Sequence, residues 1–318
     1  MKRARRIGIF ASAGLSVWLL PCAIIGVVAV EGALHPVRLP ISVEKERLAR
    51  AVARANDASL TDVEVRADDG TILRAWSLRP ASGNGDAVIL LHGQGDNRAG
   101  MLGNAEMLLR HGYAVLLPDA RAHGMSGGLI GTYGVLEADD VRRWFDWLRL
   151  SESPHCIDGL GDSMGGAELL RSLDAEHGFC AVIAESAFAT FREAAYDRLG
   201  QQFYTGPWLG RTLFRPALIF GIAYARMRYG IDLRRADPAR AVAATRVPVL
   251  LIHGLADTNL PPRHSETIKA GNMTVALWEP ASADHCGASS AEPMEYERRV
   301  IGWFSGHDFH QAAVRGLR

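Results

Sequence analysis

Three short segments, far apart in the chain, each place a residue suited to acyl transfer after an apolar run. Ser163 lies in the sequence GDSMG (161–165), between an apolar run and a helical pattern. Asp257 follows the strand-like run VPVLLIHG, and His285 follows the run TVALWEP. A serine hydroxyl becomes a good nucleophile when a histidine takes its proton, and a carboxylate orients that histidine. The residue types and their order therefore predict Ser163 as nucleophile, Asp257 as acid and His285 as base.

The glycines beside Ser163 have a steric explanation. The pattern G-x-S-x-G between a strand and a helix is typical of a sharp turn that exposes the serine Oγ, where larger neighbours would clash. The helix expected to begin at Met164 directs its free N–H groups toward the same point. A second N–H donor is expected from the loop LLHGQGDN, where we assign Gln94, with Gly95 as the alternative. The backbone N–H groups of Gln94 and Met164 would then form an oxyanion hole.

These residues need a sheet that brings the ends of several strands to one edge. Short apolar runs alternate with helical patterns along residues 61–318. This alternation is typical of an α/β fold with a mainly parallel sheet and helices on both faces. The dipeptide Asp69-Gly70 predicts a hairpin turn before the alternation starts. The expected buried strands are AVILLHG, YAVLLPDA, CIDGLG, FCAVIAES, VPVLLIHG and TVALWEP.

Two segments depart from this alternation. Residues 31–60 have the pattern of a linker followed by a charged helix. From about 187 to 245 the chain shows helical and aromatic patterns with no strand pattern between them. We interpret this second segment as a helical cap inserted into the domain. It would serve as additional core, as a lid for acyl chains, or as a surface that contacts a bilayer.

The first 30 residues predict a membrane anchor. The basic start MKRARR is followed by 24 residues without charge, Ile7–Val30. A helix of that length spans roughly 36 Å, which exceeds the ~30 Å of a hydrocarbon core. The alternative is a cleaved signal peptide, whose apolar region is usually shorter. The basic start places the N-terminus in the cytoplasm and the main domain on the non-cytoplasmic side.

Composition excludes several other classes. The net charge is zero and no basic stripe occurs, so we expect no nucleic-acid partner. The four cysteines form no C-x-x-C pair and the histidines have no metal-binding spacing, so we expect neither a metal nor a cofactor. Cys156 and Cys180 each open an expected strand. A disulfide between them is one hypothesis, and buried thiols are the preferred one.

Several residues have competing interpretations. Glu185 ends a neighbouring strand and is the alternative to Asp257 as the acid. The glycines around Ser163 also resemble part of a dinucleotide-binding turn, although that interpretation leaves the loops of Asp257 and His285 unexplained. Cys286 lies beside the predicted base and is interpreted as structural. Simpler structural roles are expected for the other polar residues near these loops, which are His92 (supporting the oxyanion loop), His253, Asp119, His123, Asp139 and Asp140.

The chain resembles the α/β-hydrolase superfamily, in particular its Bem46-like and serine aminopeptidase-like serine hydrolases. The segments that carry the resemblance are LLHGQGDN, LLPDARAHGMSGG, GDSMGG, HGLADTNLP and ADHCG, which span residues 87 to about 304. The resemblance implies the α/β-hydrolase fold, with Ser163, Asp257 and His285 as the catalytic triad and Gln94 and Met164 as the oxyanion hole. The segment ADHCG departs from the family pattern, which usually has a glycine on the amino side of the histidine.

These features together predict a membrane-anchored serine hydrolase that cleaves carboxylic esters or thioesters through an acyl-enzyme. The expected substrate is a small acyl compound, including lipid-like ones. Members of the resembled branch also include peptidases, so a peptidase or amidase of the same fold is the first alternative. A non-catalytic hydrolase-like binding protein is the second. The complete set of serine, histidine and aspartate argues against it, because a binder needs no such set.

Overall fold

The computed structural model describes residues 2–202 and 204–307, with side chains from Trp18 onward. The chain divides into two compact units. The smaller unit comprises residues 1–35 and 191–235, and the larger unit comprises residues 36–190 and 236–318. All residues predicted to do chemistry belong to the larger unit.

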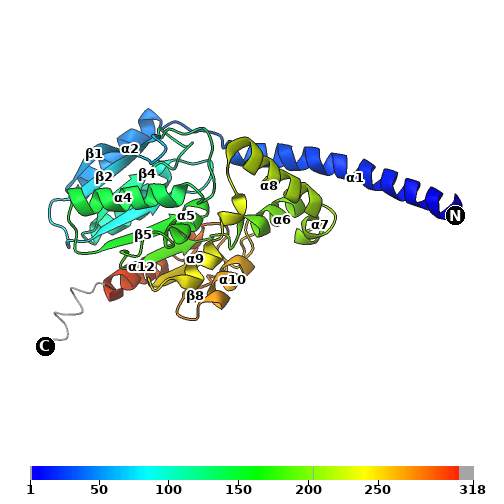
Figure 1. The fold of residues 1–318 in the computed structure, drawn as a ribbon. Coiled ribbons are helices and arrows are strands. Elements are labelled where there is room, and N and C mark those ends of the chain that lie inside the picture. Colours follow the sequence, from blue (N-terminus) through cyan, green and yellow to red (C-terminus); the bar gives the residue numbers. More distant parts are fainter. Residues whose placement is uncertain (1, 203, 308–318) are drawn as a thin grey trace. The chain divides into compact units, whose positions relative to one another are not determined.

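The larger unit is built on a central sheet, whose strands Figure 1 shows together with the helices that cover them. Its described residues form eight strands in the order β1-β2-β4-β3-β5-β6-β7-β8. β1 and β2 pair antiparallel, β2 and β4 pair antiparallel, and every other pair is parallel, which confirms the predicted mainly parallel sheet. The strands are β1 (Ala58–Arg66), β2 (Ile72–Pro80), β3 (Ala87–Leu91), β4 (Ala114–Pro118), β5 (Ile157–Asp162), β6 (Val182–Glu185), β7 (Val249–Ile252) and β8 (Ala276–Trp278).

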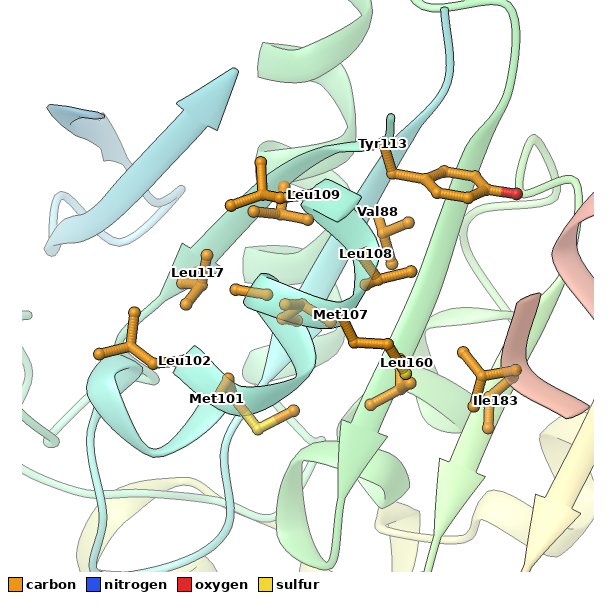
Figure 2. Close-up of a cluster of buried hydrophobic side chains, with 14 of the residues drawn as sticks. Val88, Met101, Leu102, Met107, Leu108, Leu109, Tyr113, Leu117, Leu160 and Ile183 are labelled. Atoms are coloured by element: carbon orange, nitrogen blue, oxygen red, sulfur yellow. The ribbon is translucent and has the colours of Figure 1, made fainter. Parts of the chain in front are cut away.

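Helices cover both faces of this sheet. One face carries α2, α3 and α12, whose apolar side chains form a single buried cluster with those of the strands. Figure 2 shows part of it, with Met107 and Leu108 of α3 lying over Val88, Leu160 and Ile183 of the strands. On the other face α5 contacts α4 and α9. The helices of this unit are α2 (Val43–Ala55), η1 (Arg98–Met101), α3 (Leu102–Arg110), α4 (Glu137–Ser151), α5 (Met164–Ser172), α9 (Pro238–Ala244), α10 (Arg263–Gly271), α11 (Ala288–Ala291) and α12 (Pro293–His307).

A disulfide joins the starts of β5 and β6. Cys156 and Cys180 have Cα atoms 5.7 Å apart, within the usual range for a disulfide. β5 and β6 are parallel neighbours, so the residues that precede them meet at one edge of the sheet. The preferred expectation of buried thiols is therefore wrong for this pair. The other two cysteines that the structure describes, Cys22 and Cys286, are free thiols.

The smaller unit consists of helices in its described part. Its elements are α1 (Lys2–Leu34), α6 (Phe191–Gln202), α7 (Pro207–Arg211), α8 (Arg215–Tyr229) and η2 (Leu233–Arg235). α1 and α8 lie close together because glycine, which has no side chain, leaves room at their crossing. A Cβ added at Gly26 would lie 2.0 Å from the carbonyl oxygen of Ala217. Of the insertion predicted over 187–245, residues 191–235 belong to this unit, whereas α9 packs on α5 in the larger one.

The predicted membrane anchor is not confirmed. Among the helices whose side chains are described, none is both long and apolar enough to span a bilayer. The expected span Ile7–Val30 lies only partly in that portion, because the side chains before Trp18 are outside the described residues.

Candidate active site

Ser163 stands at a strained turn between β5 and α5. Its backbone has φ +53° and ψ −111°, a conformation that a residue with a side chain adopts only when its surroundings enforce it. A Cβ at Gly161 would lie 2.6 Å from the Gly165 backbone, and a Cβ at Gly165 would lie 2.4 Å from the Leu91 carbonyl oxygen. Larger residues at either position would clash with the backbone, as predicted. The glycines are therefore explained by this turn, without a dinucleotide-binding role.

The structure brings Ser163, Asp257 and His285 together in one hydrogen-bonded chain. His285 Nδ1 lies 2.7 Å from Asp257 Oδ2, and His285 Nε2 lies 2.9 Å from Ser163 Oγ. A carboxylate only accepts, so Nδ1 carries the proton and Nε2 presents its lone pair to the serine hydroxyl. The three residues follow β5, β7 and β8, whose carboxyl ends lie at one edge of the sheet. This arrangement suits the transfer of the Ser163 proton to His285.

The Asp257 carboxylate is held as an anion. Its side chain is fully buried, and its Oδ1 accepts the backbone N–H groups of Asn259 and Leu260, each at 2.9 Å. Burial raises its pKa, but hydrogen bonds from His253, His285 and the Leu260 amide outweigh burial and keep the pKa well below its usual value. Asp257 is therefore a charged carboxylate at neutral pH.

His253 contacts the predicted acid, and this contact was not expected from the sequence. Its Nε2 donates to the Leu260 carbonyl at 2.8 Å and lies 3.4 Å from Asp257 Oδ2. Since Nε2 carries the proton, Nδ1 accepts the hydroxyl hydrogen of Ser265 at 2.7 Å. His253 was expected only to pack at a strand end. Its position four residues before Asp257, at the end of β7, was the available signal.

The predicted oxyanion residues flank the nucleophile. Met164 is the first residue of α5, so its N–H has no acceptor within the helix. The loop that carries Gln94 runs beside Ser163, because a Cβ at Gly93 would lie 3.5 Å from the Ser163 Cβ. Both assigned amides therefore come from segments next to the serine.

His92 supports this loop, as predicted. Its Nε2 accepts the Ala120 N–H at 3.1 Å, so its Nδ1 carries a proton and donates to the Gly93 carbonyl at 2.8 Å. Burial, aided by the neighbouring His123, lowers the pKa of His92 to about 4. The neutral imidazole fixes Gly93 to the loop after β4.

Glu185 does not occupy the acid's place. Its Oε1 accepts the N–H of Ala288 at 2.9 Å, while its backbone carbonyl accepts the N–H of Ser163 at 2.8 Å. Burial raises the pKa of Glu185 to about 7. Asp162, its neighbour across β5 and β6, also has a pKa raised by burial and by the Glu185 charge. The acid in contact with His285 is Asp257.

The remaining polar residues near the site have structural partners. Asp119 accepts a hydrogen bond from the buried Arg98 guanidinium at 2.8 Å, and Asp140 accepts one from Arg121 at 2.7 Å. Burial raises the pKa of the Cys286 thiol, which makes it a poor nucleophile, in agreement with its predicted structural role. The part of the chain described by the structure contains no cluster of histidine, cysteine and acidic side chains that would hold a metal ion.

The chain is similar in sequence to known proteins. The model of the alpha/beta hydrolase family matches residues 88–298. The uncharacterized protein YqkD of Bacillus subtilis is 28% identical over 221 residues, which cover 68% of this chain and 70% of that protein. The uncharacterized protein YfhR of Escherichia coli K12 is 26% identical over 218 residues, covering 66% of this chain and 67% of YfhR.

Solved structures have the same fold. The Pyrococcus furiosus esterase Pf2001 matches with a TM-score of 0.67 and 25% identity, covering 86% of this chain and all of the esterase. An acylaminoacyl peptidase of Pyrococcus horikoshii matches with a TM-score of 0.60 and 16% identity, covering 79% of this chain and 42% of the peptidase, a likeness of fold alone. These matches do not distinguish the Bem46-like branch. The family match covers most of the chain and coincides with the sheet and its strand-end residues, so the chain belongs to the alpha/beta hydrolase family.

Proposed function

We propose that the protein is a serine hydrolase that cleaves carboxylic ester or thioester bonds through an acyl-enzyme on Ser163. The observation that carries this proposal is the continuous chain of Asp257, His285 and Ser163, with contacts of 2.7 Å and 2.9 Å, at a strained turn in an alpha/beta hydrolase. A hydroxyl, an imidazole and a buried carboxylate in this geometry have the roles of nucleophile, base and orienting acid.

The reaction runs in two halves. Ser163 Oγ attacks the carbonyl carbon while His285 Nε2 takes its proton, and the N–H groups of Gln94 and Met164 stabilise the oxyanion. Collapse of the tetrahedral intermediate breaks the bond to the leaving group, which receives the proton from His285. Water then attacks the acyl-enzyme, with His285 again as base, and the acid and the free Ser163 hydroxyl are released. Asp257 stabilises the imidazolium in both halves.

Ester cleavage is favoured over peptide cleavage by the relatives. The esterase Pf2001 matches at 25% identity and over its whole length, whereas the acylaminoacyl peptidase matches at 16% and over less than half of its length. A peptidase or amidase remains the second candidate, because the same triad serves amides. Hydrolysis of p-nitrophenyl esters from acetate to palmitate, beside aminoacyl and acylaminoacyl p-nitroanilides, would separate the two. Cleavage of the anilides alone would refute the ester proposal.

The nucleophile is tested by labelling with a fluorophosphonate probe. The wild type should be labelled and the Ser163→Ala variant should not. Ser151→Ala is the matched control, because Ser151 is an exposed serine at the end of α4. Ester hydrolysis should fall at least ~1,000-fold in Ser163→Ala. Equal labelling of wild type and Ser163→Ala would remove Ser163 from the mechanism, and a wild type without turnover would favour a binding protein.

The location of the protein stays a prediction from the sequence. The uncharged segment Ile7–Val30 is its basis, and the Cys156–Cys180 disulfide supports a domain on the non-cytoplasmic side, since disulfides persist in oxidising compartments. Carbonate extraction should leave an anchored protein in the membrane pellet. Release into the supernatant would contradict the anchor.

A further inference from the structure

Tyr133 has a strained backbone close to the proposed oxyanion hole. Its φ is +57°, which is unusual for a residue with a bulky side chain. The residue is 9% exposed. Such strain costs about 1–3 kcal/mol and persists only where the surroundings enforce it, often at functional sites.

A buried carboxylate enforces this conformation. Glu137, which is 2% exposed, accepts the N–H of Thr132 at 2.5 Å and the N–H of Gly134 at 2.8 Å, the amides on either side of Tyr133. It also accepts the Thr132 hydroxyl at 2.6 Å. On the far side, a Cβ at Gly134 would lie 2.9 Å from the Arg171 side chain, which leaves this turn little room to relax.

The strained turn delivers the Tyr133 hydroxyl to the oxyanion loop. Gln94 Nε2 donates to Tyr133 Oη at 2.7 Å. The Tyr133 ring packs edge-on against Phe188, with ring centroids 6.3 Å apart, and Phe188 is itself buried. Gln94 is exposed to solvent, and the next residue, Gly95, has φ +74°. The buried Tyr133 side chain therefore holds the exposed Gln94 in a turn that ends at Gly95.

We propose that Tyr133 is a positioning residue for the oxyanion hole. By holding the Gln94 side chain, it keeps the Gln94 backbone N–H aimed at the oxyanion of the intermediate. His92 fixes the preceding residue, Gly93, so the loop is held at two successive positions. Oxyanion stabilisation depends on donors placed before the charge develops, so a mobile Gln94 would lower the rate and leave substrate binding nearly unchanged. This proposal rests on the proposed function.

The test compares Tyr133→Phe, Gln94→Leu and the double variant with the wild type. Tyr133→Phe keeps the ring and removes only the hydroxyl, and Gln94→Leu keeps the backbone N–H. Loss of a whole oxyanion donor typically costs 100- to 1,000-fold in kcat, and a misplaced donor should cost about tenfold. Tyr204→Phe is the matched control, because Tyr204 is 98% exposed.

Kinetics and inhibitor binding together separate positioning from general damage. Each single variant should lose about tenfold in kcat for p-nitrophenyl butyrate, with KM within twofold of the wild type. Because the two residues act through one hydrogen bond, the double variant should lose no more than either single variant. An alkyl boronic acid, which forms a tetrahedral adduct on the serine, should bind about tenfold more weakly, whereas butyrate should inhibit equally.

Two results overturn the proposal alone. One is Ser163-dependent turnover in the wild type with Tyr133→Phe within twofold of it. The other is loss of kcat in the single variants without weaker boronate binding. Multiplication of the two losses in the double variant would also overturn it, because the two side chains would then act independently. Should Tyr133→Phe unfold, Gln94→Leu at its exposed position gives the same comparison. Absence of Ser163-dependent turnover in the wild type would overturn the proposed function and this proposal with it.

Discussion

Substitution of Asp257 by asparagine tests the proposed acid with nearly no change in volume. In the native site Oδ1 accepts the N–H groups of Asn259 and Leu260, so the single oxygen of an asparagine amide would stay there. Its NH2 group would then take the place of Oδ2. That position faces His285 Nδ1 at 2.7 Å and His253 Nε2 at 3.4 Å.

This exchange reverses the tautomer of the base. An NH2 donor at 2.7 Å requires His285 Nδ1 to accept, so the proton moves to Nε2, the atom that faces Ser163 Oγ at 2.9 Å. Nε2 can then no longer take the serine proton. Loss of this function is worth about 10³- to 10⁴-fold in kcat, or about 4–5.5 kcal/mol of activation free energy. The variant also loses charge-assisted hydrogen bonds, which we expect to lower the unfolding free energy by about 2 kcal/mol.

The assay is steady-state hydrolysis of p-nitrophenyl butyrate with thermal unfolding of the same samples. Glu185→Gln is the matched control, because Glu185 is the other buried carboxyl near the base and does not contact it in the structure. We expect Asp257→Asn to lose kcat at least 10³-fold and Glu185→Gln to stay within about threefold of the wild type. A folded Asp257→Asn variant that keeps more than a tenth of kcat would refute the tautomer argument. Equal losses in both variants would refute the assignment of the acid.

Three further predictions concern stability. Glu185 has a folded pKa of about 7, above the ~4.3 of an unfolded glutamate, so as pH rises the unfolded state releases its proton first and stability falls between about pH 4.5 and 7. The unfolding free energy of Glu185→Gln should therefore exceed that of the wild type by about 3.5 kcal/mol at pH 8 and by less than about 1 kcal/mol at pH 4.5. An equal difference between the two proteins at both pH values, in denaturant titrations, would contradict this. Gly165→Ala puts a Cβ 2.4 Å from the Leu91 carbonyl oxygen, so we expect a loss of about 3 kcal/mol or no folded protein in urea titrations, against little change for the open Gly103→Ala. Cys156→Ala removes a bridge between residues 24 apart in sequence and should lower the unfolding free energy by about 3 kcal/mol, a loss that reduction of the wild type should reproduce.

Much of the fold follows from local patterns in the sequence. The buried strands are short apolar runs, and their alternation with helical patterns determines a mainly parallel sheet, because each strand must be covered on both faces. The turn at Ser163 was also predictable, since only small residues fit at 161 and 165 beside a backbone that lies 2.4–2.6 Å from an added Cβ. Helix α3 was missed although its buried residues, which include Leu102, Ala105 and Leu109, have helical spacing.

Contacts between segments that are far apart in the sequence could be determined only from the tertiary structure. Sequence spacing does not tell whether Asp257 or Glu185 reaches His285, because both end parallel strands at the same edge; the observed Oδ2 to Nδ1 distance of 2.7 Å selects Asp257. The Cys156–Cys180 bridge depended on β5 and β6 being neighbours, which composition cannot reveal.

The sequence also leaves most of the contacts around the oxyanion loop undetermined. The chain by itself determined that Ser163 needs an imidazole, a carboxylate and two amide donors, since a serine hydroxyl is unreactive without them. The fold decided most of the contacts that hold those groups in place. His253 against Asp257 and Tyr133 against Gln94 are contacts between side chains, and His92 binds the backbone carbonyl of Gly93. The supporting role of His92 was predicted from its place in the loop, but the contact of Tyr133 with Gln94 depends on backbone directions in three dimensions, because these residues are 39 positions apart in the sequence.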